Sequence, residues 1–349
     1  MLNQSAHKSY AERLVAFDTV DGLTLNVINV RGKKKPDRGP VILVHGAGVR
    51  GNIFRAPVQT TIVDALIEHG YDVWLENWRA SIDFPLTDWN LDKAALYDHP
   101  AAVATVVKET GIKTVKAIIH CQGSTSFAMS ALAGLIPQVD TIVTNAVSIH
   151  TVVPTWSGFK LKYVIPTMSP ILRSMNPGWG DDAPGFIPKV LILMVKASHH
   201  ECSNTACRLV SFTYGSGYPA LWRHENLNAD THDWFIQQEF GHVPLSFFRH
   251  MARCVARGNL VSIDGLNGLP ADYCAQAPKT DARFAFFAGE MNQCFLPESQ
   301  RRSYEWLSSF RPNYHSLNVL PTYSHLDLFM GVKAATDVFP KMIAALDRP

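Results

Sequence analysis

The feature that most constrains this chain is a repeated alternation of short apolar runs with amphipathic stretches. Apolar runs at residues 41–44, 71–75, 115–120, 141–147, 283–288 and 316–320 predict buried strands. The amphipathic stretches between and after them, at residues 57–69, 93–110, 125–135, 298–310 and 334–346, predict helices. Two further strands, at 14–19 and 23–30, flank an Asp-Gly turn and predict a hairpin. Together these segments are typical of a mostly parallel, eight-stranded α/β sheet flanked by helices.

The alternation stops between residues 151 and 279, where aromatic and proline-rich patches follow no regular βα period. A sheet that is interrupted after its sixth strand and completed later is what a large insertion produces. We therefore expect residues 1–150 and 280–349 to form one α/β core, and residues 151–279 to form a cap over it.

Composition excludes several classes of protein. The net charge is +2 and like charges do not cluster, so nothing favours nucleic acid as a partner. The N-terminal segment lacks an apolar signal core, and no stretch approaches 18 apolar residues, so we expect no membrane insertion. Six scattered cysteines are too few for a disulfide framework. A cytoplasmic protein is the expectation.

The most informative segment is residues 116–125, in which an apolar strand runs into Cys121, a glycine follows two residues later, and a helix begins. This is the setting of a nucleophile elbow, a tight turn that exposes its central side chain at the sheet edge. In the G-x-S-x-G pattern Cys121 takes the serine position, Gly123 the second glycine and Ile119 the first. Ser124 and Ser126 are alternative nucleophiles, although they should lie inside the helix, away from the tip of the turn.

A second motif follows the strand at 41–44 and begins His45-Gly46-Ala47. A His-Gly sequence at this point normally supplies one backbone N–H of an oxyanion hole. We expect the backbone N–H groups of Ala47 and Gln122 to be its two donors.

The general base is predicted to be His325, which follows the last strand and precedes the final helix. The residue that orients it should follow the strand at 283–288, where a G-x-x-D pattern is usual. Asn292 stands at the aspartate position, and Glu290 is the competing candidate. An amide can accept the Nδ1–H of a histidine but carries no charge. A Cys-His-Asn set nevertheless works in papain-type enzymes, because a thiolate and an imidazolium can form before the substrate arrives.

The run His199-His200-Glu201-Cys202, followed by Cys207, suggests a zinc site only weakly, because no second ligand pair is apparent. A local turn with packed or disulfide-linked cysteines is the preferred interpretation. We expect neither a metal nor a cofactor.

These motifs resemble a known group. The overall plan is similar to the acid-lipase branch of the α/β-hydrolase fold. A closer resemblance is to the hydrolase domain fused behind cholesterol-oxidase-like (GMC-type) flavoproteins. The matching stretches are residues 120–125, 201–208, 227–232 and 289–299. No G-x-G-x-x-G flavin fingerprint is present, so the resemblance implies fold and site but no oxidase activity.

The sequence therefore predicts hydrolysis of an acyl ester or thioester through a covalent acyl-thioester on Cys121, with His325 as base. The acyl donor would be a small molecule, or a chain carried by CoA or a carrier protein. Aromatic residues of the insertion could line an apolar acyl pocket. Two alternatives stay open: an acyltransferase or lactone-forming cyclase that uses the same acyl-enzyme, and a catalytically silent protein that binds an apolar ligand.

Overall fold

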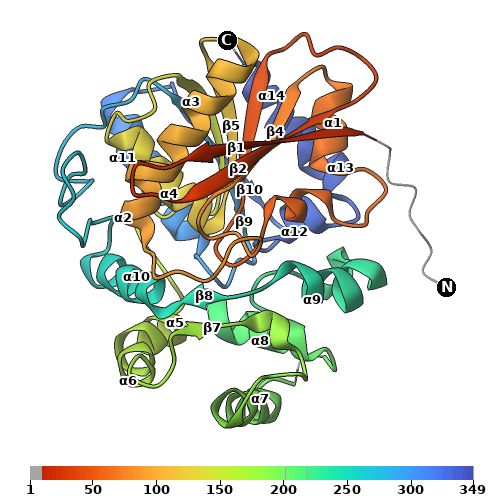
Figure 1. Ribbon diagram of the computed structural model, residues 1–349, viewed down its shortest axis with the longest axis vertical. Helices are drawn as coiled ribbons and strands as arrows, with labels where there is room; N and C mark the ends of the chain where they lie inside the picture. Colours follow the sequence, from red (N-terminus) through yellow and green to blue (C-terminus); the bar gives the residue numbers. More distant parts are fainter. Residues whose placement is uncertain (1–9, 201, 218, 349) are drawn as a thin grey trace.

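The computed structural model describes residues 10–200, 202–217 and 219–348. Its centre is an eight-stranded sheet in the order β1-β2-β4-β3-β5-β6-β9-β10 (Figure 1). The hairpin β1–β2 is antiparallel, β2 pairs antiparallel with β4, and all other neighbours are parallel. The predicted fold class is confirmed. The strands are β1 (Ala11–Asp18), β2 (Thr24–Arg31), β3 (Pro40–Val44), β4 (Asp72–Asn77), β5 (Val115–His120), β6 (Val139–Asn145), β9 (Arg283–Gly289) and β10 (Ser316–Leu320).

The central strands are buried on both faces. Every residue of β3, β4 and β9 is buried, which is why these strands are rich in apolar residues and show no alternation of apolar and polar positions. Helices cover the two faces of the sheet (Figure 1). The main ones are α1 (Ile62–Glu68), α3 (His99–Thr110), α4 (Cys121–Leu132), α11 (Pro297–Phe310) and α14 (Phe339–Asp347), with short helices η1 (Gly51–Arg55), α2 (Leu91–Lys93), η2 (Ala94–Asp98), α12 (Asp327–Met330) and α13 (Ala334–Asp337).

Two predicted helix starts were wrong, for identifiable reasons. Helix α1 begins five residues later than predicted, at Ile62, because Thr61 and Asp64 form a capping box that satisfies the first backbone N–H groups. Helix α4 begins earlier than predicted, at Cys121 itself, because the turn between strand and helix contains no intervening loop. The nucleophile candidate is thus the first residue of a 12-residue helix.

The segment from 151 to 279, called the insert segment below, contributes no strand to the main sheet among its described residues. It packs across the carboxyl ends of the parallel strands, as Figure 1 shows. Hydrogen bonds from Gly241 N to Gly48 O (2.9 Å) and from Tyr214 Oη to Ala47 O (3.1 Å) fasten it there. Its elements are α5 (Thr155–Phe159), η3 (Lys160–Val164), α6 (Ile165–Met168), β7 (Ser174–Met175), η4 (Pro177–Trp179), α7 (Phe186–Ser198), α8 (Thr205–Tyr214), η5 (His224–Asn226), η6 (Asp230–Phe235), α9 (Ile236–Glu239), β8 (Val243–Pro244) and α10 (Leu245–Arg257).

Within the described part of the chain, no helix combines the length and the apolar character that crossing a bilayer requires.

Candidate active site

Cys121 occupies a strained turn between β5 and α4. Its φ angle is +56°, in the left-handed region that a residue with a Cβ rarely adopts. Such strain persists only where the surroundings impose it, and it is concentrated at functional sites. The side chain is only 7% exposed, so a reagent or substrate must enter the interior to reach it.

Two glycines allow the backbone to close around this turn. A Cβ at Gly46 would lie 2.9 Å from Cys121 Cβ and 3.3 Å from its Sγ, so the His-Gly motif runs directly past the thiol. A Cβ at Gly123 would lie 2.0 Å from the carbonyl oxygen of His45, which only glycine permits. Ile119, at the position of the usual first glycine, is fully buried in β5 and pairs with β3 and β6. The sheet therefore accommodates the large side chain of Ile119 at a position where the elbow pattern usually has glycine.

His325 lies beside Cys121. The Cys121 sulfur and ring nitrogens of His325 and His120 lie within 4.8 Å of one another. The rings of His120 and His325 are 4.7 Å apart between centroids, and both histidines are buried. The His325 backbone is fixed by a hydrogen bond from its N–H to Leu221 O (3.1 Å), so the insert segment helps to set its position.

The loop after β9 places Asn292 next to the ring of His325. The Asn292 Nδ2 atom is 3.0 Å from His325 Nδ1, and Asn292 is buried. Gly289 makes this possible, because a Cβ there would lie 1.8 Å from Ser324 O and would push the two loops apart. Glu290, the competing candidate, has an exposed side chain and stands away from this contact.

Asp327, two residues after His325, is likewise not oriented toward its ring. Its carboxylate accepts hydrogen bonds from the backbone N–H of Arg223 (3.1 Å) and Ser324 (2.8 Å) and from Asn226 Nδ2 (2.8 Å). Burial raises the pKa of Asp327 to about 6, while these hydrogen bonds oppose the shift. The residue therefore anchors the His325 loop to the insert segment.

The orientation of the Asn292 amide has a chemical consequence. Its Oδ1 accepts hydrogen bonds from the backbone N–H groups of Cys294 (2.9 Å) and Phe295 (3.2 Å), so its Nδ2–H must face His325. His325 Nδ1 is then a hydrogen-bond acceptor, and a neutral ring carries its proton on Nε2. We expected the amide to accept the Nδ1–H of His325. The structure reverses that direction, because two backbone donors already occupy the amide oxygen.

The surroundings of Cys121 favour its thiolate. Burial raises the pKa of the Cys121 thiol, but the neighbouring Cys294 thiol, the charge that His325 carries when it is protonated, and the Gln122 N–H together lower it well below its ordinary value. The N-terminus of α4 adds a favourable dipole. The neighbouring Cys294 shows the opposite behaviour: its hydrogen bond to Cys121 and its burial raise its pKa well above the ordinary value. Cys294 thus remains a thiol that donates to the Cys121 sulfur.

The sequence reasoning did not single out Cys294. The only signal was its position two residues after Asn292, in the loop that was expected to face the Cys121 turn.

The two serine alternatives point into the core. Ser124 Oγ lies 2.5 Å from Thr144 Oγ1. Ser126 Oγ lies 2.7 Å from His99 Nε2, and His99 Nδ1 lies 2.7 Å from Glu76 Oε1, an arrangement that imitates a catalytic triad. All three members of this set are 0% exposed, so no substrate can reach them. They connect α4, α3 and β4 inside the core.

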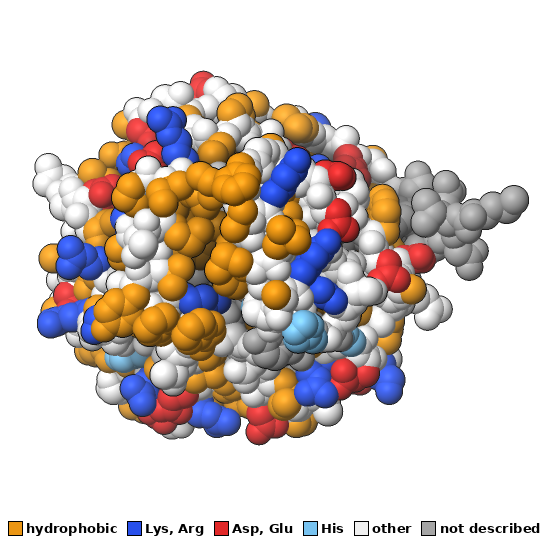
Figure 2. All heavy atoms as spheres, turned by 90° about the horizontal axis from the view of Figure 1, so that it is seen from below, with side chains coloured by type: hydrophobic (Ala, Val, Ile, Leu, Met, Phe, Trp, Pro, Cys, Tyr) orange, Lys and Arg blue, Asp and Glu red, His pale blue; other side chains and the backbone are white. Residues whose placement is uncertain are grey.

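A mainly apolar pocket opens from Cys121 into the insert segment. It encloses about 750 Å³ of space, part of it open to solvent. Figure 2, which views the insert segment from below, shows hydrophobic side chains gathered around a hollow on this face. Of the aromatic residues in the insertion, Phe212 and Tyr214 are among those that line the pocket, but aliphatic residues and methionines outnumber the aromatic ones in its apolar lining. The apolar lining includes Val153, Leu161, Val164, Ile165, Met168, Met175, Phe212, Tyr214, Phe247, Phe248, Met251 and Phe295.

Lys160 is the one cation among the residues that line this pocket. Its Nζ donates to the carbonyl oxygens of Phe212 (2.5 Å) and Gly215 (2.6 Å). Burial lowers the pKa of Lys160 to about 8, because a charged ammonium is costly in apolar surroundings.

Comparison with solved structures identifies the architecture. An esterase from Thermogutta terrifontis aligns over 96% of this chain and 100% of its own, with a TM-score of 0.56 and 13% identity. A lipase in its open form aligns over 97% and 99% of the two chains, with a TM-score of 0.61 and 13% identity. The chain has the α/β-hydrolase fold.

Curated relatives are also lipases and esterases. Human lipase member K is 24% identical over 94% of this chain and 86% of its own length. Yeast sterol esterase 2 is 24% identical over 37% of this chain, and human gastric triacylglycerol lipase is 33% identical over 31%. The aligned region spans only 27% of the sterol esterase and 31% of the gastric lipase. No protein-family model matches the chain. These likenesses support a hydrolase enzyme, and lipases of this fold usually carry serine where this chain has Cys121.

Proposed function

We propose that this protein cleaves esters or thioesters of apolar acyl chains through a thioester acyl-enzyme on Cys121. The observation that carries the proposal is the position of Cys121: a strained turn at a helix N-terminus, a thiol whose surroundings favour the anion, and an apolar pocket that opens directly onto its sulfur. In this proposal the insert segment, residues 151–279, is a cap that supplies the acyl pocket.

The first step needs only the thiolate when the donor is a thioester. The Cys121 sulfur attacks the acyl carbonyl, a new C–S bond forms, and the carbonyl oxygen becomes an oxyanion beside the backbone N–H groups of Ala47 and Gln122. Collapse of this intermediate breaks the original C–S bond and releases the donor as a thiolate. Because thiols have a pKa of about 8.5, this leaving group departs without a proton. An ester donor releases an alkoxide, which needs a proton. His325 can give one only as an imidazolium, protonated on both Nδ1 and Nε2, so the donor orientation of Asn292 hinders this step as well.

The second step depends on the state of His325. Water must lose a proton as it attacks the thioester, and His325 Nε2 can take that proton only when the ring holds its own proton on Nδ1. The donor orientation of Asn292 disfavours that tautomer. Hydrolysis by this route therefore requires the amide to rotate, at the cost of two backbone hydrogen bonds to its oxygen.

That orientation favours a second candidate function. A thiolate acceptor attacks the acyl-enzyme without a base, so transfer of the acyl chain from one thiol to another would bypass the step that Asn292 hinders. Lactone formation would not, because a hydroxyl acceptor also has to lose a proton. Thiol-to-thiol acyl transfer, with CoA- or carrier-bound chains as donor and acceptor, is thus the form of acyltransferase that the site supports. The motifs similar to those of the hydrolase domain in GMC-type proteins support a relation to that group, which we include in the proposal.

Intact-protein mass spectrometry tests the proposal directly. The protein is mixed with acyl-CoA thioesters and with p-nitrophenyl esters of increasing chain length, and quenched in acid. We expect one acyl adduct per chain, mapped to Cys121 by peptide analysis, that decays faster when a free thiol is added than in buffer alone. The Cys121→Ala variant should form no adduct, whereas Cys254→Ala, at a buried cysteine outside the pocket lining, should behave as the parent does. A parent enzyme that binds these compounds in the pocket but never forms an adduct would identify the chain as a silent binding protein.

A further inference from the structure

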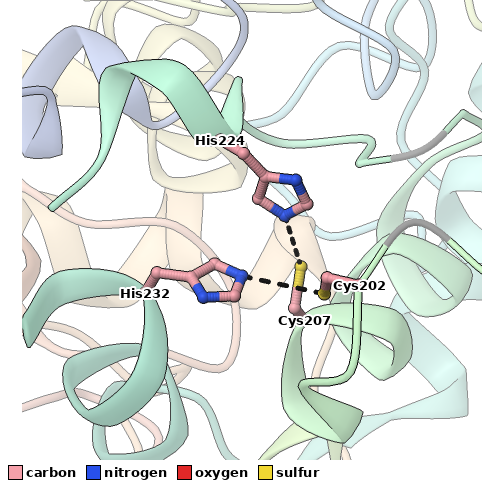
Figure 3. Close-up of side chains that lie close together, drawn as sticks. All are labelled: Cys202, Cys207, His224 and His232. Carbon is pink, nitrogen blue, oxygen red and sulfur yellow. Dashed lines mark hydrogen bonds between the residues drawn. The ribbon is translucent and has the colours of Figure 1, made fainter. Parts of the chain in front are cut away.

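Four side chains of the types that ligate metals converge in the insert segment, and none of them lines the pocket at Cys121. Cys202 precedes α8, Cys207 lies in its first turn, and His224 and His232 belong to η5 and η6 (Figure 3). Their ligand atoms, two sulfurs and two imidazole nitrogens, all lie within 4.8 Å of one another.

The spacing of these atoms is close to that of a tetrahedral zinc site. The Cys207 sulfur is 3.5 Å from His224 Nε2, and the Cys202 sulfur is 3.8 Å from His232 Nε2. Zinc bonds of about 2.3 Å to sulfur and about 2.0 Å to nitrogen, placed at tetrahedral angles, separate a sulfur from a nitrogen by about 3.5 Å. A single ion between the four atoms would therefore need only small movements of their side chains.

The histidines present the correct nitrogen. Both direct Nε2 toward the sulfurs, and His232 Nδ1 lies 2.5 Å from the carboxylate of Asp233. A carboxylate that holds the Nδ1–H of a zinc-ligating histidine fixes its tautomer and strengthens its Nε2 as a ligand. This contact is the usual outer-shell partner of a zinc site.

The surrounding backbone holds the cysteines in place. Asn204 caps α8 by accepting the backbone N–H of Cys207 (3.0 Å), and its Nδ2 donates to His232 O (2.8 Å). One asparagine thus joins the segments that carry Cys202, Cys207 and His232. The four-residue gap between the cysteines is within the range of structural zinc sites.

We propose that Cys202, Cys207, His224 and His232 bind a structural Zn²⁺ ion. Two thiolates and two neutral imidazoles give a complete set of four ligands, which leaves no open position for catalysis and makes the site structural. We expected no metal because the run that begins at His199, together with Cys207, showed no second pair of ligands. In the structure, the His199 ring packs against Phe212, His200 is exposed, and Glu201 lies outside the described residues. The true partners lie 17 and 25 residues after Cys207, too far along the chain for a local motif to show.

The ion would act on the active site by fixing the insert segment. His224 lies between Arg223 and Asn226 in the chain. The Arg223 backbone N–H and Asn226 Nδ2 both donate hydrogen bonds to the carboxylate of Asp327. Asp327 in turn holds the loop that carries His325. Loss of the ion is therefore expected to loosen this loop as well as the insert segment.

The test begins with the unmodified protein, purified under reducing conditions without chelator and analysed by mass spectrometry for metals. We expect about one zinc per chain. Replacing it with Co²⁺ should give the visible bands of tetrahedral cobalt together with thiolate-to-cobalt charge-transfer absorption. A strong chelator should remove these bands, expose two additional thiols to a thiol reagent, and lower Tm by several degrees.

Variants then locate the ion. Cys202→Ser and His232→Gln should each lower zinc retention during dialysis by about 10-fold or more, whereas the matched controls Cys274→Ser and His242→Gln should retain it. The Cys121→Ala variant should also retain zinc, which separates this site from the Cys121 and His325 cluster. If the ligand variants fail to fold, the cobalt spectrum of the parent still decides the question. Parent protein that gives no cobalt bands at saturating metal, or that carries a Cys202–Cys207 disulfide after reducing purification, would overturn the proposal.

Discussion

The Asn292→Asp substitution should convert the active site into a better ester hydrolase. The two side chains have the same shape, so one carboxylate oxygen can keep the hydrogen bonds from Cys294 N and Phe295 N. The other oxygen would take the place of Nδ2, which lies 3.0 Å from His325 Nδ1 in the parent. A donor that opposes an Nδ1–H is thereby replaced by a charged acceptor that favours it. His325 then carries its proton on Nδ1 and leaves Nε2 free to act as a base.

The size of the effect follows from this single contact. A hydrogen bond to a charged group contributes about 1.5–3 kcal/mol, and each ~1.4 kcal/mol corresponds to a tenfold change in rate. We expect kcat for hydrolysis of an alkyl ester to rise about 10- to 100-fold. Thiol-to-thiol acyl transfer, which needs no base, should change by less than about threefold under the same reasoning.

The measurement compares two rates in the same protein. One is steady-state hydrolysis of an alkyl ester, and the other is acyl transfer from an acyl-CoA to a free thiol. The ratio of hydrolysis to transfer should rise in the variant. Glu290→Gln is the matched control, because it also alters a polar residue of this loop but has an exposed side chain. It should leave both rates unchanged. A folded Asn292→Asp protein whose ester hydrolysis is equal to or below that of the parent would refute the assigned direction of the Asn292 hydrogen bond.

Further predictions concern the Cys121 thiol, the glycine of the elbow and the protonation of buried His45. Iodoacetamide should alkylate Cys121 faster than the other cysteines and at nearly the same rate at pH 6 as at pH 8, since the pKa of its thiol is lowered well below the ordinary value; equal labelling of all six would contradict this. Cys121→Ser should lose about 10²-fold or more in acyl transfer, and a serine enzyme that matched the parent would show that thiolate chemistry is not required. Gly123→Ala should fail to fold or lose much of its Tm because the new Cβ would lie 2.0 Å from a carbonyl oxygen, whereas Gly158→Ala, whose nearest atom would be 3.9 Å away, should be tolerated. Burial lowers the pKa of His45 to about 3, so the unfolded chain binds a proton there that the folded protein does not. Stability should therefore fall as the pH drops from about 6.5 toward 3, and urea unfolding of His45→Gln at pH 7 and pH 5 should show a smaller loss than the parent does.

Local sequence patterns were sufficient to predict the scaffold and the strand, turn and helix around Cys121. A parallel strand buried on both faces is a near-continuous apolar run, so the strands of the sheet could be predicted directly from the sequence. The strand, turn and helix around Cys121 follow from the same kind of signal, because the backbone at Gly123 tolerates no side chain. Element ends were less certain, since they depend on individual caps such as the one that delays α1 to Ile62.

Contacts between distant segments decided everything that distinguishes this site. Asn292 could be placed near His325 from its position in the loop, but which end of its amide faces the ring depends on backbone donors that only the folded loop supplies. Cys294 became relevant only when folding brought it against the Cys121 sulfur. The zinc ligands His224 and His232 meet the two cysteines only because η5 and η6 pack beside α8 in the insert segment. Sequence patterns report each residue's local conformation, whereas hydrogen-bond direction, thiol ionisation and metal coordination depend on atoms that only tertiary packing brings within a few ångströms of one another.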